Sequence, residues 1–115
     1  MTTQLQQQSI SNYFVAANKH DVAGMLASFA EGASVLDEGR ERNGLTEIEQ
    51  WMKETLVNTD IKMELLSVRE NATGTDVISR LTGTFPGSPA DLRFAFKLTG
   101  EKISELEISY ANGDI

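Results

Sequence analysis

The apolar residues of this chain change their spacing at about residue 60. Before that point they recur at the i, i+3, i+4, i+7 spacing of one helical face. After it they alternate one by one, as in a strand with one buried face. Helices followed by a run of strands indicate an α+β domain, in which the helices cover the apolar face of the sheet. The chain has 115 residues, which suits one such domain spanning residues 1–115.

Three helical segments are expected in the first half of the chain. Asp21 has the side chain to cap the start of the second helix, and Gly32 is suited to end it. Thr46 and Glu49 have the spacing of a capping box, which places the start of the third helix there. The three apolar faces consist of Ile10, Tyr13, Phe14 and Ala17, then Val22, Met25, Leu26 and Phe29, then Ile48, Trp51, Met52 and Leu56.

Five strands are expected, the first at residues 33–37 and four more after residue 60, joined by short turns. Residues 39–44 are polar and glycine-rich, and we expect a loop there. Together these elements predict a cone-shaped, curved antiparallel sheet covered by three N-terminal helices. Such a cone tends to leave an open end in which a small ligand can bind.

The composition limits the partners of the chain. The net charge is −7, and the ten basic residues are scattered, which argues against binding to nucleic acid or to an anionic membrane surface. No apolar run approaches the about 18 residues of a membrane span, and no secretion leader is recognisable at the start. We therefore expect a soluble, cytoplasmic protein with neither a nucleic-acid partner nor a membrane partner.

Metal and thiol chemistry are also disfavoured. The chain has no cysteine, which excludes disulfides and thiolate catalysis. The single histidine, His20, lies in NKHDVAG between two helical segments, where we expect an exposed turn. We expect no metal site and no cofactor.

The segment SVLDEG carries a carboxylate pair, Asp37 and Glu38, at the end of the first expected strand. Strand alternation places Val35 and Asp37 on one face, so Asp37 faces the core if Val35 does, and Glu38 faces solvent. A carboxylate that faces an apolar cavity loses hydration and becomes a stronger base near neutral pH. The alternative is that Asp37 binds the amides of the following loop and stays solvated.

Tyr13 lies on the buried face of the first helix, and its hydroxyl needs a hydrogen-bond partner there. The partner can be a ligand carbonyl or a group of the protein itself. The candidate cavity walls are the apolar residues of the helices and of the inner sheet face, and the small side chain of Ser79 leaves volume among them. The alternative is that most of these residues only fill a core. The expected ligand-lining residues are Phe14, Trp51, Met52, Met63, Ser79, Leu81, Phe94, Phe96, Leu106, Ile108 and Tyr110.

The order of elements, the Y-x7-D spacing across the first two helices and the segments FAEGASVLDEG and NGLTEIEQWM resemble the nuclear transport factor 2-like superfamily, with its cystatin-like roll. The closest likeness is to SnoaL-like proteins and ketosteroid isomerase, over about residues 10–110. The resemblance implies that Asp37 moves the proton and that Tyr13 polarises the substrate carbonyl. The sequence departs where that enzyme has a second, acidic donor, because Phe94 stands there. Phe29 and Met52 replace supporting tyrosines.

These observations predict a protein that binds a small apolar molecule bearing a carbonyl. The resemblance implies a cofactor-free isomerase or cyclase with Asp37 as general base and Tyr13 as hydrogen-bond donor. It also implies a homodimer through the convex sheet face. The alternative is a non-catalytic module for ligand binding or protein association on the same fold. A dehydratase would need a histidine in the pocket, and His20 is expected at the wrong end of the helices.

Overall fold

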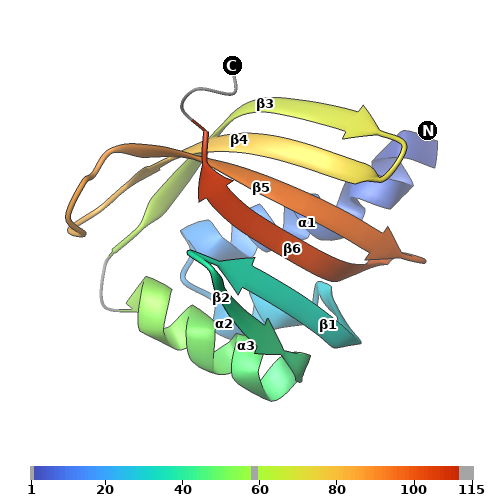
Figure 1. Ribbon diagram of the computed structural model, residues 1–115, viewed down its shortest axis with the longest axis horizontal. Coiled ribbons are helices and arrows are strands. Elements are labelled where there is room, and N and C mark those ends of the chain that lie inside the picture. The colour runs from blue at the N-terminus through green and yellow to red at the C-terminus, as the bar shows by residue number, and fades with distance from the viewer. Residues whose placement is uncertain (1, 58–59, 112–115) are drawn as a thin grey trace.

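The computed structural model describes residues 2–57 and 60–111, and the side chains of residues 8–55 and 60–111. Figure 1 shows helices α1 and α2 behind a curved sheet, with α3 at its lower end beside β2. The sheet order is β2-β1-β6-β5-β4-β3. The elements are α1 (Thr2–Asn18), α2 (Val22–Leu26), β1 (Phe29–Asp37), β2 (Arg40–Asn43), α3 (Gly44–Met52), a π-helical turn η1 (Lys53–Val57), β3 (Lys62–Asn71), β4 (Gly74–Thr82), β5 (Ala90–Thr99) and β6 (Lys102–Tyr110).

The expected α+β architecture is confirmed, with two differences in the sheet. β1 pairs with β6 in parallel, so the sheet is mixed and not purely antiparallel. Residues expected as a loop form strand β2, which pairs with β1. A tight turn makes this pairing possible, because Glu38 and Gly39 both have positive φ angles, 54° and 78°. Two successive residues with positive φ match the twist of a two-residue hairpin.

The helix boundaries differ from those expected at two places. The Asp21 cap is confirmed, since its carboxylate accepts the Gly24 N–H at 3.0 Å. α2 ends at Leu26, however, so Gly32 lies within β1 and ends no helix. α3 begins at Gly44, and the carboxylate of Glu47 accepts the Asn43 N–H at 2.8 Å. The capping box expected at residues 46 and 49 is therefore wrong, because the backbone enters the helix earlier.

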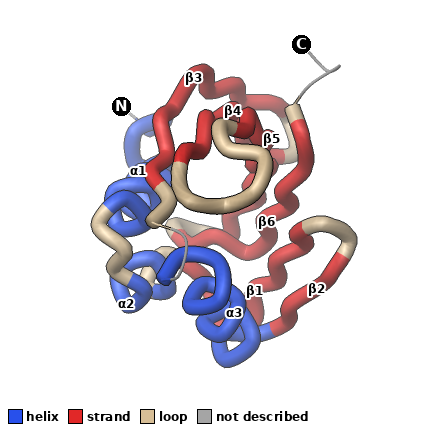
Figure 2. Tube along the Cα trace, turned by 90° about the vertical axis from the view of Figure 1, so that its left-hand side faces the viewer, coloured by secondary structure: helices blue, strands red, loops and turns tan. Residues whose placement is uncertain are grey.

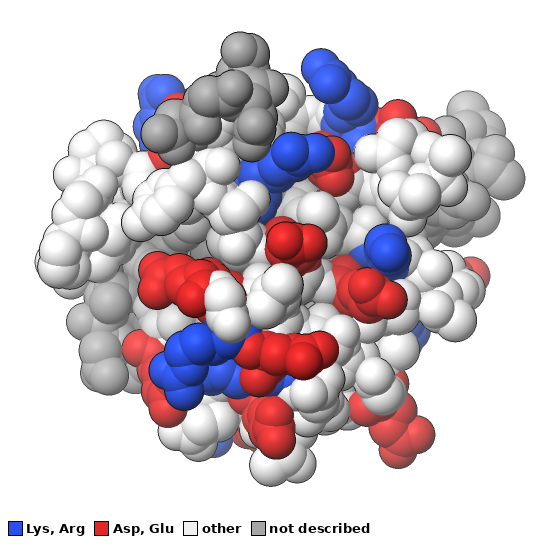
Figure 3. Space-filling view, viewed as in Figure 1, with Lys and Arg blue, Asp and Glu red and all other residues white. Residues whose placement is uncertain are grey.

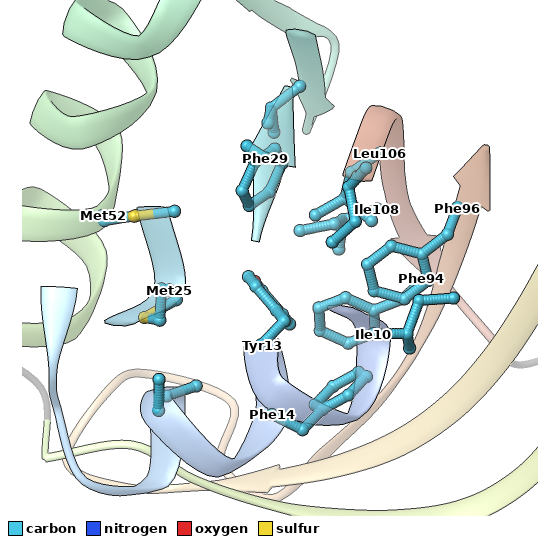
Figure 4. Packing of buried hydrophobic residues seen from close by; sticks show 14 of the residues in the cluster. Ile10, Tyr13, Phe14, Met25, Phe29, Met52, Phe94, Phe96, Leu106 and Ile108 are labelled. Atoms are coloured by element: carbon cyan, nitrogen blue, oxygen red, sulfur yellow. The ribbon is translucent and has the colours of Figure 1, made fainter. Parts of the chain in front are cut away.

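Aromatic rings from α1, β1 and β5 meet in the centre of the core (Figure 4). Tyr13 contacts Phe14 and Phe29 edge to face, with ring centroids 5.1 and 5.9 Å apart. Phe14 contacts Phe94 at 5.2 Å in the same manner. Such edge-to-face pairs stabilise a core by about 0.5–1.5 kcal/mol beyond the burial of their area. The rings thus fix α1 against the middle of the sheet.

The C-terminus of α1 is attached to the edge strand β3 by the side chain of Asn18. Its Oδ1 accepts the Met63 N–H at 2.6 Å, and its Nδ2 donates to the Met63 carbonyl at 2.9 Å. The amide group thus takes the place that a neighbouring strand would have at this point of the edge. The Lys62 ammonium donates to the Asn18 carbonyl at 3.0 Å and adds a further link.

We expect Asn18→Ala to lower the free energy of unfolding by about 1–3 kcal/mol, because it leaves two part-buried backbone groups of Met63 without partners. Urea denaturation followed by circular dichroism measures this. Asn12→Ala is the matched control, since the Asn12 side chain is exposed and its hydrogen bond in the described part of the chain is to Gln8 on the same helix. Equal losses in the two variants would contradict the role of Asn18.

Candidate active site

Asp37 ends strand β1 and is partly buried, whereas Glu38 after it is exposed. In the sheet Asp37 lies beside Ile108 of β6, which is buried. The indole Nε1–H of Trp51 donates to Asp37 Oδ2 at 2.9 Å. Trp51 was expected as an apolar wall. The structure shows that its ring is buried and that its N–H binds the carboxylate.

This hydrogen bond makes the two oxygens of Asp37 different. Oδ2 is held by Trp51, whereas Oδ1 has no hydrogen-bond partner among the described residues. A hydrogen bond to a charged acceptor is stronger than one between neutral groups and also fixes orientation. Asp37 is therefore a carboxylate held in one orientation with one oxygen left to accept a proton.

The Tyr13 side chain is 1% exposed and points into the core between Met52, Phe29 and the end of β6 (Figure 4). No hydrogen bond joins its hydroxyl to another residue in the described part of the chain. Burial raises the pKa of Tyr13 far above that of a free tyrosine, and the negative charge of Asp37 raises the pKa further. The phenol therefore stays protonated, and its O–H can donate to a developing negative charge.

The alkaline titration of Tyr13 follows from this. We expect a Tyr110→Phe variant, in which Tyr13 is the only tyrosine, to show no tyrosinate absorbance at pH 10 while it remains folded. A raised pKa means that the folded state disfavours ionisation, so stability is present below pH 10 and falls as the pH rises above it. Tyrosinate should appear only together with the loss of circular dichroism.

The Tyr13→Phe variant supplies the reference for this titration, because only the exposed Tyr110 remains in it. Reversible ionisation of Tyr13 near pH 10 in protein with native circular dichroism would contradict the burial of its hydroxyl.

The other expected lining residues fall into three groups. Phe14, Phe94 and Phe96 pack on Tyr13 and on one another, and they fill the interior next to it. Tyr110 was expected in a wall, but it is 63% exposed at the end of β6 and so lies at most on a rim. The remaining residues are buried on the inner side of the sheet or on the helices: Met52, Met63, Ser79, Leu81, Leu106 and Ile108.

Ser79 was expected to leave volume in the cavity. It is fully buried, and its hydroxyl donates to the Glu64 carbonyl at 3.0 Å, next to the irregular register of β3. His20 lies in the turn between α1 and α2, and its Nε2 lies 2.8 Å from the Ile61 carbonyl. Ser79 therefore binds the backbone of β3, and His20 binds the backbone at Ile61, just before β3 begins.

The surface has a hollow along α1 and α2 and another on the convex sheet face, and neither of these is lined by Asp37, Tyr13 or Trp51. The larger, about 400 Å³, lies along α1 and α2. The smaller, about 190 Å³, lies on the convex sheet face.

Among residues 2–57 and 60–111 no group of three or more His, Asp or Glu side chains could hold a metal ion. Over the same ranges no helix has the length and apolar character of a membrane span.

A model of the SnoaL-like domain matches residues 10–106, which is most of the chain and includes Tyr13, Asp37, Trp51 and Phe94. The chain belongs to the SnoaL-like domain family. The resemblance inferred from the sequence is thereby confirmed. A search of curated proteins finds no match for this SnoaL-like chain.

Solved structures with the same fold support the assignment. A protein from Sinorhizobium meliloti, described as a candidate polyketide cyclase, is 28% identical with a TM-score of 0.84, over 89% of this chain and 94% of that one. SalBIII, an epoxide hydrolase/cyclase-like enzyme of pyran ring formation in salinomycin, is 20% identical with a TM-score of 0.82, over 97% and 95%. A Catenulispora acidiphila protein with a ketosteroid isomerase-like fold is 15% identical with a TM-score of 0.78, over 89% and 84%. At such low identity the last two show the fold alone.

Proposed function

We propose that this SnoaL-like protein is a cofactor-free enzyme that moves a proton on a small apolar molecule bearing a carbonyl, with isomerisation or cyclisation as the outcome. The observation that carries the proposal is the Asp37 carboxylate, held by Trp51 at 2.9 Å, with one oxygen that bonds no described residue. Tyr13 supports it as a buried donor within electrostatic reach of Asp37. The 28% identical candidate polyketide cyclase supports the cyclase alternative.

In the proposed reaction, Asp37 Oδ1 takes a proton from the carbon next to the substrate carbonyl. The electrons of the broken C–H bond form a carbon–carbon double bond, and charge develops on the carbonyl oxygen. Tyr13 donates its O–H to that oxygen and stabilises the charge. Isomerisation follows when Asp37 returns the proton to another carbon. Cyclisation follows when the enolate carbon attacks a second carbonyl of the same molecule, whose oxygen takes the electron pair of the broken C=O π bond and then the proton from Asp37.

Phe94 limits this reaction. It stands where the resemblance implies a second donor, and its ring can neither donate a hydrogen bond nor ionise. Loss of one donor to the developing charge typically costs on the order of 100- to 1,000-fold in rate. We therefore propose a substrate whose proton is more acidic than that of a simple ketone, such as a carbon between two carbonyl groups.

The proposed walls are the buried residues expected from the sequence, with Tyr110 at the rim. Admission of a ligand requires the aromatic cluster and Trp51 to move apart, since the interior next to Tyr13 is filled by rings.

We also propose a homodimer that forms through the convex sheet face, and a cytoplasmic location. Figure 3 shows acidic and basic side chains interspersed on this face. Ion pairs on this face within the chain include Arg80–Asp91, Arg93–Asp76 and Lys97–Glu105.

The test combines binding with proton exchange. Trp51 is the only tryptophan, so its fluorescence reports events at Asp37 without a label. A panel of aromatic and alicyclic β-dicarbonyl compounds and enones is titrated against this signal. Exchange of their α-protons for deuterium is then followed by NMR. We expect exchange faster than in buffer for compounds that change the fluorescence. A panel in which no compound exchanges faster than in buffer would overturn the proposal.

The second candidate is a non-catalytic binding module, favoured by the apolar Phe94 at the position of the missing donor and by the ring-filled interior. It predicts fluorescence changes that saturate with ligand, without any accelerated exchange. The same titration and NMR series therefore separates the two functions.

A further inference from the structure

Strand β3 forms one edge of the sheet, and in the described part of the chain only β4 pairs with it. Figure 1 shows β3 along the upper side of the sheet, and Figure 2 shows β2 at the far end from it. Nine of its ten residues are exposed, all except Met63. The Asn18 side chain binds the backbone of Met63 and covers the edge there. Over residues 64–69 no described residue outside β4 forms a hydrogen bond to the strand.

The uncovered part of β3 is apolar as well as exposed. Leu65, Leu66 and Val68 are 47%, 41% and 50% exposed. An edge strand with exposed apolar side chains is a template for pairing with another chain. The other edge strand, β2, has four residues, and none of them is apolar. Short charged edges are protected against pairing, so of these two edges β3 is the one suited to dock a further strand.

A bulge at Leu66 decides which side chains of β3 share a face. Leu65 pairs with the buried Ser79 of β4, so it lies on the inner face of the sheet. Val68 pairs with the buried Val77 and lies on the same face. Residues three apart in a regular strand point to opposite faces, and the extra residue of the bulge removes this offset.

The same bulge brings two opposite charges, Glu64 and Arg69, onto the convex face. They lie opposite Arg80 and Asp76 of β4. Each of these two neighbours is already bound to a residue of β5 in an ion pair of 2.8 Å. Neither Glu64 nor Arg69 forms an ion pair with a residue that the structure describes. The edge therefore has an apolar pair on its inner face and an acid and a base on its convex face.

We propose that β3 pairs in antiparallel direction with β3 of a second copy of this chain, so that two six-stranded sheets join edge to edge. The register that sets Glu64 opposite Arg69 of the second copy also sets Leu65 opposite Val68 of that copy. The two-fold axis repeats both pairs. Opposite charges and apolar side chains directly across two strands stabilise their pairing. Charges on an edge usually prevent pairing, but the order of charges on β3 is complementary to itself.

Neighbouring registers lose this match. A shift of one residue sets inner-face side chains opposite convex-face ones. A shift of two residues sets Arg69 opposite Lys62 in one direction and Leu65 opposite Glu70 in the other. Of these registers, only the proposed one joins opposite charges on one face and apolar side chains on the other. The contact is separate from the proposed convex-face homodimer, and where both form it joins two dimers.

Charge reversal tests the pairing, with analytical ultracentrifugation of the full chain over a concentration series as the readout. Glu64→Arg and Arg69→Glu each set like charges opposite one another, and each should weaken the edge contact at least about tenfold. The double variant exchanges the two charges and should regain the parent affinity. An equimolar mixture of the two single variants should also associate, because one chain then presents two bases and the other two acids.

Two further variants separate the edge from the sheet face. Leu65→Lys places a charge among the apolar side chains of the edge and should abolish the contact, while circular dichroism stays native because the side chain is half exposed. Glu107→Lys reverses an exposed charge on the convex face of β6 and should leave the contact unchanged.

Three outcomes would overturn the proposal. The first is a parent chain that stays monomeric throughout the concentration series. The second is association that Glu107→Lys weakens and the β3 variants leave unchanged, which would place the interface on the convex face. The third is a mixture of the two single variants that associates no better than either variant alone.

Discussion

Asp37→Asn is expected to slow α-proton exchange by about 1,000-fold and to change ligand affinity by less than about threefold. Asparagine cannot take up the proton, so the general base is lost. Its side-chain oxygen can still accept the Trp51 N–H that Asp37 Oδ2 accepts now, so the position of the side chain is retained. Exchange rates by NMR and dissociation constants from Trp51 fluorescence measure the two effects separately.

Glu38→Gln is the matched control for this prediction. It removes the neighbouring carboxylate, which is exposed in the turn between β1 and β2, and should leave both rate and affinity unchanged. An Asp37→Asn protein that keeps more than about a tenth of the exchange rate would show that another group is the base. Equal loss in the two variants would point to the net charge of the region and not to a positioned carboxylate.

The orientation of Asp37 was predictable from sequence because one face of β1 is buried. Val35 is fully buried, and a period of two then turns Asp37 the same way and Glu38 outward. Strand β2 was not predictable in this way. Its residues, RERN, are mostly exposed and charged, so no apolar alternation marks them, and backbone pairing with β1 holds them. The parallel pairing of β1 with β6 was also hidden, because apolar alternation does not encode which strand lies next to which.

The hydrogen bond between Trp51 and Asp37 could not be predicted from the spacing of the apolar residues. Helical spacing predicted that Trp51 is buried, which is confirmed. It could not show that the indole N–H meets a carboxylate 14 residues away, since that depends on where α3 starts and how it crosses β1. The available signal was chemical, because a buried indole N–H needs an acceptor. For Tyr110 the alternation predicts the face of β6 but not the burial. The side chain is exposed because no described residue covers that end of the strand.

Phe94→Asp, which would restore the acidic donor that the resemblance implies, is expected to leave the protein unfolded. Phe94 is 1% exposed, and its ring lies 5.2 Å from that of Phe14 and 6.3 Å from that of Phe96. Truncating a buried phenylalanine costs about 3–5 kcal/mol, and burying a carboxylate without a partner adds several more. A domain of this size has only about 5–15 kcal/mol of stability to lose.

Circular dichroism and urea denaturation of Phe94→Asp and Phe94→Leu together test this expectation. The leucine variant keeps most of the apolar volume and should stay folded, with a loss of about 1–3 kcal/mol. A folded Phe94→Asp protein would mean that the aromatic cluster opens enough at this position to admit a carboxylate and water. The position would then be open to a second donor, and proton exchange faster than in the parent protein should follow. If instead only the leucine variant folds, Phe94 is required by the core, and Tyr13 must act as the single donor to the substrate oxygen.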